Sequence, residues 1–426
     1  MTFNPPLFLL TGLGWLCLSI LLGLLLLLTN ILGQPLPPVF RPIHVHAALV
    51  GGVGQIILGA MLAFTPALLL TGRDRPSSHP VLYGAINLGA LGMLIGFALG
   101  HSLIIGGAGV LVVLAFLSLL GDVVRQARTS LVSAPLNIWF YGVALLALLI
   151  GLGVGEAMSL QLFSHETIGR ARLAHIHLNL LGFVTLTIVG TMHNLFPTVL
   201  NGRLHSPLLA RMTFVILPLG IAVLIAGFLT GQLYVDILAG AIFITGVILY
   251  GYNIVRTWLE AGRPRRAATD HLLLATFFLL LAVITGFLVS INSLSYPPPI
   301  PFGTLHLVAY THLALVGFVL QTIMGALSHL LPITLAVSRT ESNKKREPYL
   351  SELNGLIEYG RPVQVGALCL GTIGLALVAS LVWQFHLGDW PVKLATWTAA
   401  GLLFVGFGLF AGKVSLLVTR RPSDAN

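Results

Sequence analysis

Apolar stretches of about twenty residues recur along the whole chain, and this recurrence constrains the fold more than any other feature. A stretch of that length crosses the hydrocarbon core of a bilayer as a helix. It must be helical because lipid offers no partner to an exposed backbone N–H or C=O group. Only 8% of the residues are charged and 56% are hydrophobic. These values exclude a soluble domain and predict an all-α, polytopic membrane protein.

Twelve such spans are expected, and together they make residues 1–426 a single membrane domain. The first has no charged start and no small-residue cleavage site, so we interpret it as a retained span and not as a secretory signal. The predicted spans are 6–32, 42–71, 80–101, 103–124, 134–161, 173–200, 209–231, 233–257, 271–295, 303–337, 362–386 and 392–418.

The basic residues give these spans a direction. Of the 22 lysines and arginines, all but Arg41, Arg170, Arg172 and Lys393 fall on one side of the predicted membrane. Because basic residues accumulate on the cytoplasmic side, both termini are predicted to be cytoplasmic. The net charge of +9 does not indicate nucleic-acid binding, since the basic residues are scattered among loops.

Three of the spans, within 42–71, 173–200 and 303–337, are versions of one motif. They read "HVHAALVGGVGQIILGAMLAFTP", "HIHLNLLGFVTLTIVGTMHNLFP" and "YTHLALVGFVLQTIMGALSHLLP", and they align without gaps. The spans are four apart in the order of twelve, which predicts three four-helix arcs with pseudo-threefold symmetry. The aligned residues are His46, His177 and His312; Gly51, Gly182 and Gly317; Gly59, Gly190 and Gly325; and Pro66, Pro197 and Pro332.

The glycines and the histidines of this motif need different explanations. Glycines eight residues apart share one helix face, where they let another helix or a flat ring approach closely. An old duplication would explain the glycines but not the histidines, because an imidazole inside a bilayer is costly without a partner.

Neutral imidazole is an axial ligand of haem iron, and two histidines at one depth on different helices can hold one haem. The side chains of a His-x-His pair point about 200° apart, so they face different neighbours. A zinc or copper ion held by three histidines is the competing chemistry. For a single histidine, an interhelical hydrogen bond is a further alternative.

The residues around two of these spans resemble subunit I of the haem-copper oxidases, closest to the cbb-type oxidases and the nitric oxide reductases. The resemblance lies in "RPIHVHAALVGGVGQ" and in "INSLSYPPPIPFGTLHLVAYTHLALVGF". It implies the twelve-helix, three-arc fold and a low-spin haem b with His44 and His312 as its axial ligands. The internal repeat aligns His46 with His312 instead, so His46 is the alternative ligand.

The chain also departs from that family. Tyr310 occupies the place of the high-spin haem ligand, and His177 maps onto a single copper ligand. The adjacent histidine pair expected near the end of the seventh span is missing, because the segment reads "IAGFLTGQLY". The resemblance therefore implies a member without the copper site.

A second cofactor site is a hypothesis for His175 and His177, with His306 or His101 as a further ligand. The alternative is that His175 and His177 are remnants that form hydrogen bonds only.

Three arginines are candidate partners of haem propionates, as charge-assisted pairs: Arg41, Arg170 and Arg172. The alternative for Arg170 and Arg172 is an exposed loop.

Two further predictions concern the cytoplasmic side. We expect His193, His271 and His329 to contact solvent or lipid headgroups. The hydrophilic segment 338–361 is predicted to be a cytoplasmic loop, either solvated or containing an amphipathic helix that lies on the membrane or docks a partner.

The leading hypothesis is a haem b-carrying electron-transfer subunit of a respiratory complex in the cytoplasmic membrane of a bacterium or archaeon. It would contact lipid, quinone or quinol, other subunits, and a cytochrome c-type or other redox protein at the outer face. One alternative is a divergent terminal oxidase or nitric oxide reductase. The other is a non-redox haem or gas sensor or an assembly factor.

Overall fold

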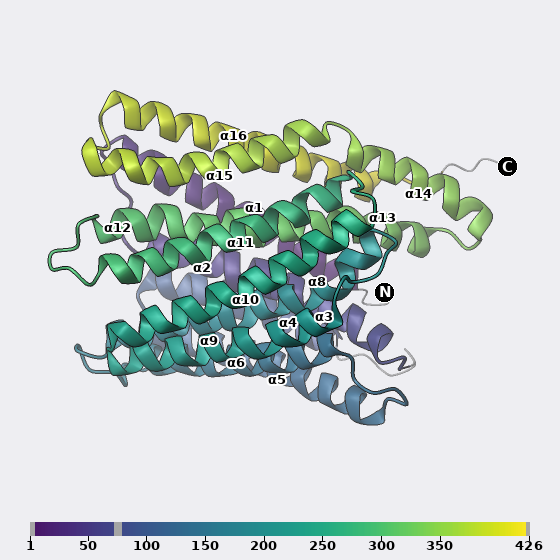
Figure 1. The fold of residues 1–426 in the computed structure, drawn as a ribbon, viewed down its shortest axis with the longest axis horizontal. Coiled ribbons are helices and arrows are strands. Elements are labelled where there is room, and N and C mark those ends of the chain that lie inside the picture. Colours follow the sequence, from purple (N-terminus) through teal and green to yellow (C-terminus); the bar gives the residue numbers. More distant parts are fainter. Residues whose placement is uncertain (1–4, 72–78, 423–426) are drawn as a thin grey trace. The chain divides into compact units, whose positions relative to one another are not determined.

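The protein is described by a computed structural model that covers residues 5–71 and 79–422 (Figure 1). Within these residues, twelve helices are long and apolar enough to cross a membrane, as predicted. Arg73 and Arg75, two of the basic residues that gave the spans their direction, lie outside the described residues. Most predicted boundaries differ from the observed ones by a few residues. The sixth span begins earlier, at Ile168, so that Arg170 and Arg172 lie on a helix and not in a loop.

Nine of the spans, among the described residues, are single α-helices. They are α1 (Pro5–Ile31), α4 (His79–Leu99), α5 (Ser102–Thr129), α6 (Leu136–Ser159), α9 (Pro207–Thr230), α10 (Leu233–Glu260), α11 (Ala267–Asn292), α15 (Arg361–Gln384) and α16 (Trp390–Thr419).

The other three spans are the repeated ones, and each changes helix type along its length. The second span is α2 (Phe40–His46), η1 (Ala47–Gly54) and α3 (Gln55–Leu68). The sixth is α7 (Ile168–His177), η2 (Leu178–Thr185) and α8 (Leu186–Val199). The tenth is α12 (Phe302–Thr304), η3 (Leu305–Tyr310), η4 (Leu313–Leu320) and α13 (Gln321–Arg339).

The segments η1, η2 and η4 are π-helices of 8 residues that begin directly after His46, His177 and His312. They therefore occupy the same place in the sequence alignment of the three spans. A π-helix is rare and is found mostly as a short widening at functional sites. Its repetition shows that the motif is a structural repeat as well as a sequence repeat.

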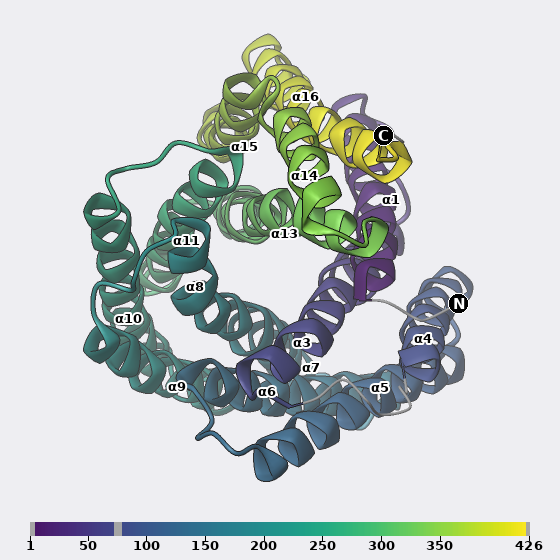
Figure 2. The same ribbon diagram turned by 90° about the vertical axis from the view of Figure 1, so that its right-hand side faces the viewer.

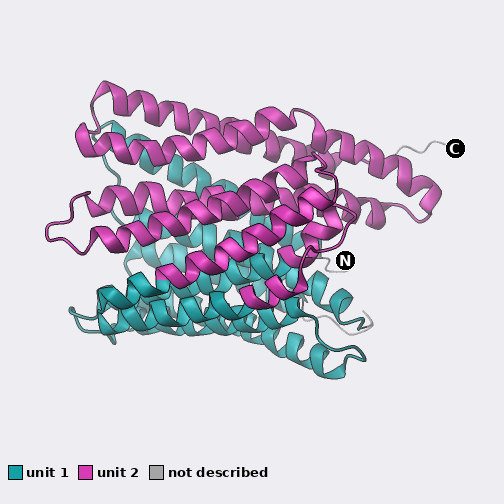
Figure 3. Ribbon diagram, in the orientation of Figure 1, with its two compact units in different colours: residues 1–191, 214–239 teal, residues 192–213, 240–426 magenta. Residues whose placement is uncertain are grey.

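The chain divides into two compact units (Figure 3). Unit 1 is residues 1–191 and 214–239, and unit 2 is residues 192–213 and 240–426. In unit 1, α1 packs along η1 and α3, α4 packs along α5 (Figure 2), and α6 packs along α5, α7 and η2. In unit 2, α11 packs along η4 and α13, and α15 packs along α16.

The aligned glycines serve helix packing. A Cβ atom on Gly51 would lie 2.5 Å from the ring of Trp15 on α1, and one on Gly317 would lie 2.6 Å from the ring of Phe278 on α11. Each glycine thus admits an aromatic side chain of the preceding span. Of the two roles expected for these glycines, close helix approach is the observed one, and space for a haem ring beside them is not.

The segment after the tenth span contains a helix, α14 (Asn343–Glu358), and is therefore not simply a solvated loop. Its buried residues Tyr349, Leu353 and Ile357 are four apart and so share one face. That face packs against α13 and α16 of the same unit. The segment is therefore a helix that packs on its own chain.

Arg339, at the end of α13, ties α14 to the end of α16. Its guanidinium donates hydrogen bonds to the carbonyl oxygens of Leu417, Val418 and Arg420, at 3.3, 2.8 and 2.6 Å. It also lies 3.0 Å from the hydroxyl of Tyr349. A cation at the C-terminal end of a helix satisfies carbonyl groups that have no partner within the helix.

Candidate functional site

The second histidine of the motif has the same anchor in all three repeats. Nδ1 lies 2.8 Å from the carbonyl oxygen of Pro42 in His46, 2.8 Å from that of Leu173 in His177, and 3.0 Å from that of Val308 in His312. A carbonyl oxygen can only accept, so Nδ1 carries the proton in each ring. Nε2 is then the unprotonated ring nitrogen, and a histidine that ligates a metal through Nε2 has this tautomer.

The first residue of the motif contacts the preceding span instead. His44 donates from Nδ1 to the carbonyl oxygen of Ser19 on α1 at 2.7 Å, and His175 donates to that of Gly151 on α6 at 2.8 Å. These two rings therefore also have the Nδ1–H tautomer and an unprotonated Nε2. In the third repeat, Tyr310 takes this place and packs against Gly286 on α11.

The two rings of the first His-x-His pair face different helices, as expected from helix geometry. His44 lies against α1, where a Cβ atom on Gly23 would approach its ring to 2.7 Å. The ring of His46 lies against Phe97 of α4, with centroids 4.7 Å apart. The two candidates for the haem ligand thus point into different surroundings, and they are not interchangeable.

His177, the residue that maps onto a copper ligand, meets an aromatic ring. The centroid of Phe228 on α9 lies 4.7 Å from that of the His177 ring, with an interplanar angle of 54°. Phe228 belongs to the segment "IAGFLTGQLY", where the resemblance leads one to expect a histidine pair. Within residues 5–71 and 79–422, no group of three or more His, Cys, Asp or Glu side chains is placed to hold a metal ion.

Two of the three candidate propionate partners occupy equivalent places. Arg41 precedes His44 by three residues and Arg172 precedes His175 by three, so each arginine lies one turn outside a histidine on the same helix face. Both side chains are exposed. Arg170 is exposed too, and its guanidinium lies against Gly231 after the end of α9.

The remaining histidines follow the predictions only in part. His101 is exposed at the start of α5, and the ring of His306 stacks on Phe302 at 5.0 Å. The prediction that His193 and His271 contact solvent is wrong, because their exposed fractions are 7% and 0%. His193 packs edge-on against Tyr250, with ring centroids 5.6 Å apart.

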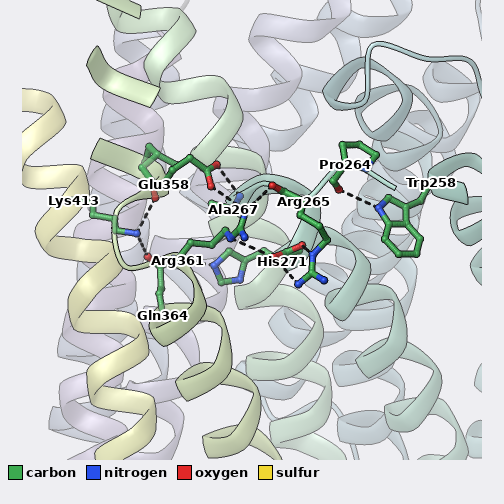
Figure 4. A network of polar contacts seen from close by, with 11 residues as sticks. Trp258, Pro264, Arg265, Ala267, His271, Glu358, Arg361, Gln364 and Lys413 are labelled. Atoms are coloured by element: carbon green, nitrogen blue, oxygen red, sulfur yellow. Dashed lines mark hydrogen bonds and ion pairs between the residues drawn. The ribbon is translucent and has the colours of Figure 1, made fainter. Parts of the chain in front are cut away.

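His271 belongs to a buried chain of hydrogen bonds that starts at Lys413 (Figure 4). The ammonium of Lys413 lies 2.8 Å from the carbonyl oxygen of Ile357 and 2.7 Å from Oε1 of Gln364. The other end of this amide, Nε2, lies 2.8 Å from Nε2 of His271. The Nδ1 atom of His271 lies 2.7 Å from Oε1 of Gln321.

Lys413 sets the donor and the acceptor of every hydrogen bond in this series. An ammonium only donates, so the amide of Gln364 accepts through oxygen and donates through nitrogen. His271 therefore accepts at Nε2 and donates from Nδ1. Its Nε2 lone pair accepts the hydrogen bond from Gln364. Lys413 was predicted to lie on the cytoplasmic side with most of the basic residues, and it is only 6% exposed within α16.

A group of ion pairs surrounds Asp270, the residue before His271 on α11. Asp270 accepts from Arg265 at 2.8 Å, and Arg361 lies 3.6 Å from its second oxygen. The hydrogen bond and the charge of Asp270 raise the pKa of Arg265. These contacts join the starts of α11 and α15 in unit 2.

Comparisons with known proteins identify the fold and a family profile that matches part of the chain. A search of the curated proteins finds no match. The family profile described as "Cytochrome C and Quinol oxidase polypeptide I" matches residues 136–298. Among solved structures, the chain is similar to one described as "Cryo-EM structure of a heme-copper terminal oxidase dimer provides insights into its catalytic mechanism". The TM-score is 0.68 at 13% identity, over 98% of this chain and 84% of that one.

The chain has the fold of that oxidase, and its residues 136–298 match the oxidase subunit I profile.

This similarity confirms the predicted fold class, an all-α membrane protein, with twelve candidate spans among the described residues. The profile match includes the sixth span with His175 and His177, whereas His44 and His312 lie outside it. The low identity to the solved oxidase means that the superfamily resemblance does not assign the ligands by itself. The roles of the individual histidines rest on their own geometry.

Proposed function

We propose that the chain is a haem b-binding electron-transfer subunit of a respiratory complex, with His44 and His312 as the axial ligands of a low-spin haem. The observation that carries this proposal is the anchoring of both rings. Nδ1 of each donates to a backbone carbonyl, in His44 to that of Ser19 and in His312 to that of Val308. Each Nε2 is thereby unprotonated and has the electron pair that an axial ligand gives to iron. The residues therefore fit a bis-histidine haem.

The chain's own residues have three tasks in this function. The carbonyl oxygen of Ser19 and its hydroxyl, 3.0 Å from Nδ1, hold the His44 ring in one orientation. Gly23 keeps the space beside that ring open. Arg41, one turn outside His44, is the proposed partner of a propionate. A bound haem supplies one-electron transfer.

The side chains around His177 argue against a copper centre in this proposal. Copper in such a site needs three nitrogen ligands. The ring of Phe228 packs on His177 where the related oxidases would supply imidazoles. Without that centre the subunit would pass electrons between the quinone pool and a redox partner at the outer face, and would not reduce oxygen.

The proposed location is the cytoplasmic membrane of a bacterium or archaeon, with both termini in the cytoplasm. The basic residues support this orientation, because the cytoplasmic loops of membrane proteins carry the excess of lysine and arginine. Other subunits of the complex, and a cytochrome c-type or other redox protein, are the proposed partners.

A pyridine haemochrome assay combined with copper analysis of the pure protein tests the proposal. We expect haem b with no stoichiometric copper. A protein with a high-spin haem and copper, and with oxygen consumption by the isolated chain, would instead be a divergent terminal oxidase.

A further inference from the structure

Three residues take the same place in the three repeats, directly after the π-helical segments. Gln55 follows η1, Leu186 follows η2 and Gln321 follows η4. All three side chains are buried, with exposed fractions of 0%, 1% and 0%. Leu186 shows that the motif accepts an apolar side chain at this place. Packing alone therefore does not require an amide, and each glutamine needs an explanation of its own.

In the third repeat, side chains of unit 2 satisfy the amide. Oε1 of Gln321 accepts a hydrogen bond from Nδ1 of His271 on α11 at 2.7 Å. Nε2 of Gln321 donates to Sγ of Cys369 on α15 at 3.1 Å. Both ends of this amide thus have a partner, as buried polar groups normally do.

In the first repeat, the amide of Gln55 has no such partners. Within residues 5–71 and 79–422, neither Oε1 nor Nε2 of Gln55 forms a hydrogen bond, and both atoms are fully buried. A buried amide in this state destabilises the fold, because it has lost the hydrogen bonds that it makes to water in the unfolded chain.

The packing of the helices shows why Gln55 lacks the histidine. Gly51 admits the ring of Trp15 on α1, and Gly317 admits the ring of Phe278 on α11, so these two rings occupy equivalent places. His271 precedes Phe278 by seven residues, and Phe8 precedes Trp15 by seven. Phe8 is 0% exposed, as His271 is, but its ring has no N–H group to donate to Gln55.

The partner on the other side is also identifiable. Gly89 of α4 and Gly371 of α15 are equivalent, because a Cβ atom on either would lie 3.0 Å from a backbone oxygen of the span that follows. Asn87 precedes Gly89 by two residues, and Cys369 precedes Gly371 by two. Asn87 therefore takes the place of Cys369 in unit 1.

The side chain of Asn87 is engaged elsewhere. Its Oδ1 accepts from the indole N–H of Trp15 at 2.9 Å, and its Nδ2 donates to the carbonyl oxygen of Tyr83 at 2.8 Å. Both places that supply the partners of Gln321 are thus occupied in the first repeat by side chains that do not bond to Gln55.

The burial of Gln55 limits what its partner can be. Because the side chain is 0% exposed, a ligand that extends to the bilayer or to the solvent does not reach it. The partner must also be able to accept from Nε2 and to donate to Oε1. Water is small enough, does both, and commonly satisfies buried polar groups that a chain leaves without a partner.

We propose that Gln55 is the anchor of an internal water site in unit 1. Ordered water there takes the part that His271 and Cys369 take for Gln321 in the third repeat. This site goes beyond the proposed function and does not depend on a bound haem.

An experimental structure of the purified protein that shows ordered water tests this inference. We expect a water peak about 2.7–3.2 Å from Nε2 or Oε1 of Gln55. No such peak should lie at the amide of Gln321, or at the same place in the variant Gln55→Leu. An amide of Gln55 that contacts apolar atoms alone, or that bonds to another side chain, would overturn the inference.

Thermal unfolding in detergent gives a second readout. Gln55→Leu places in the first repeat the residue type that Leu186 provides in the second. If water satisfies the amide, the exchange removes hydrogen bonds, so the unfolding temperature should not rise. A clear rise would show that the amide has no partner in the wild-type protein, which overturns the site. Gln321→Leu is the matched control and should lower the unfolding temperature, because it takes the acceptor from Nδ1 of His271.

Discussion

The ring of Phe228 packs on the ring of His177, with centroids 4.7 Å apart and an interplanar angle of 54°. The two residues lie on the sixth and seventh spans, within unit 1. His177 is also only 7% exposed. Its surroundings are those of a packed side chain.

The first prediction is therefore that the purified protein contains no stoichiometric copper, and that His177→Ala leaves its metal content unchanged. Elemental analysis of the wild type and the variant checks both points. Stoichiometric copper that disappears in His177→Ala would show that Phe228 does not exclude the ion.

The second prediction concerns the space beside His44. A methyl group on Gly23 would come within 2.7 Å of the ring, which the bonds to Ser19 hold in place. We expect Gly23→Ala to move the ring and to weaken or shift the low-spin haem spectrum. Gly14→Ala is the matched control, because a Cβ atom there has open space on the same helix. Identical spectra for the two variants would contradict the assignment of His44.

The third prediction concerns His271. In His271→Leu, the amides of Gln321 and Gln364 each lose a buried partner, at about 1–3 kcal/mol for each group. We expect a lower thermal unfolding temperature in detergent, whereas His101→Leu, at an exposed position, should change it little. An unchanged unfolding temperature in His271→Leu would mean that the series of hydrogen bonds from Lys413 to Gln321 contributes nothing to stability.

The fourth prediction concerns Arg339. In Arg339→Met, the carbonyl groups at the end of α16 lose their donor, which costs about 1–2 kcal/mol at a partly buried helix end. Limited proteolysis of the α14 segment should then be roughly tenfold faster, because cleavage follows the population of the open state. Lys344→Met, an exposed change on α14, should leave the rate as it is. Equal proteolysis rates for Arg339→Met and Lys344→Met would show that Arg339 does not hold α14 in place.

The spans and the repeat were predictable because the bilayer imposes length and apolarity on every helix that crosses it. The all-α fold follows from these features, and the resemblance carried by "RPIHVHAALVGG" pointed to the fold that the solved oxidase shares. Two details were not predictable. The π-helical segments leave no mark in hydropathy, and the glycine pattern suits a haem ring as well as an aromatic side chain such as Trp15.

The burial of single polar residues also could not be predicted from the sequence. Lys413 was predicted to lie on the cytoplasmic side with most of the basic residues, and its burial was not expected. Its partners, Gln364 and the carbonyl of Ile357, come from elsewhere in the chain, so no local pattern reveals them.

The haem content of His44→Ala and His312→Ala, measured by pyridine haemochrome against the wild-type protein, tests the central claim most directly. Each variant should contain one haem b fewer per chain, or keep it in a high-spin form, while His101→Ala should match the wild type. Wild-type haem content with an unchanged low-spin spectrum in both variants would show that these histidines are not the axial ligands.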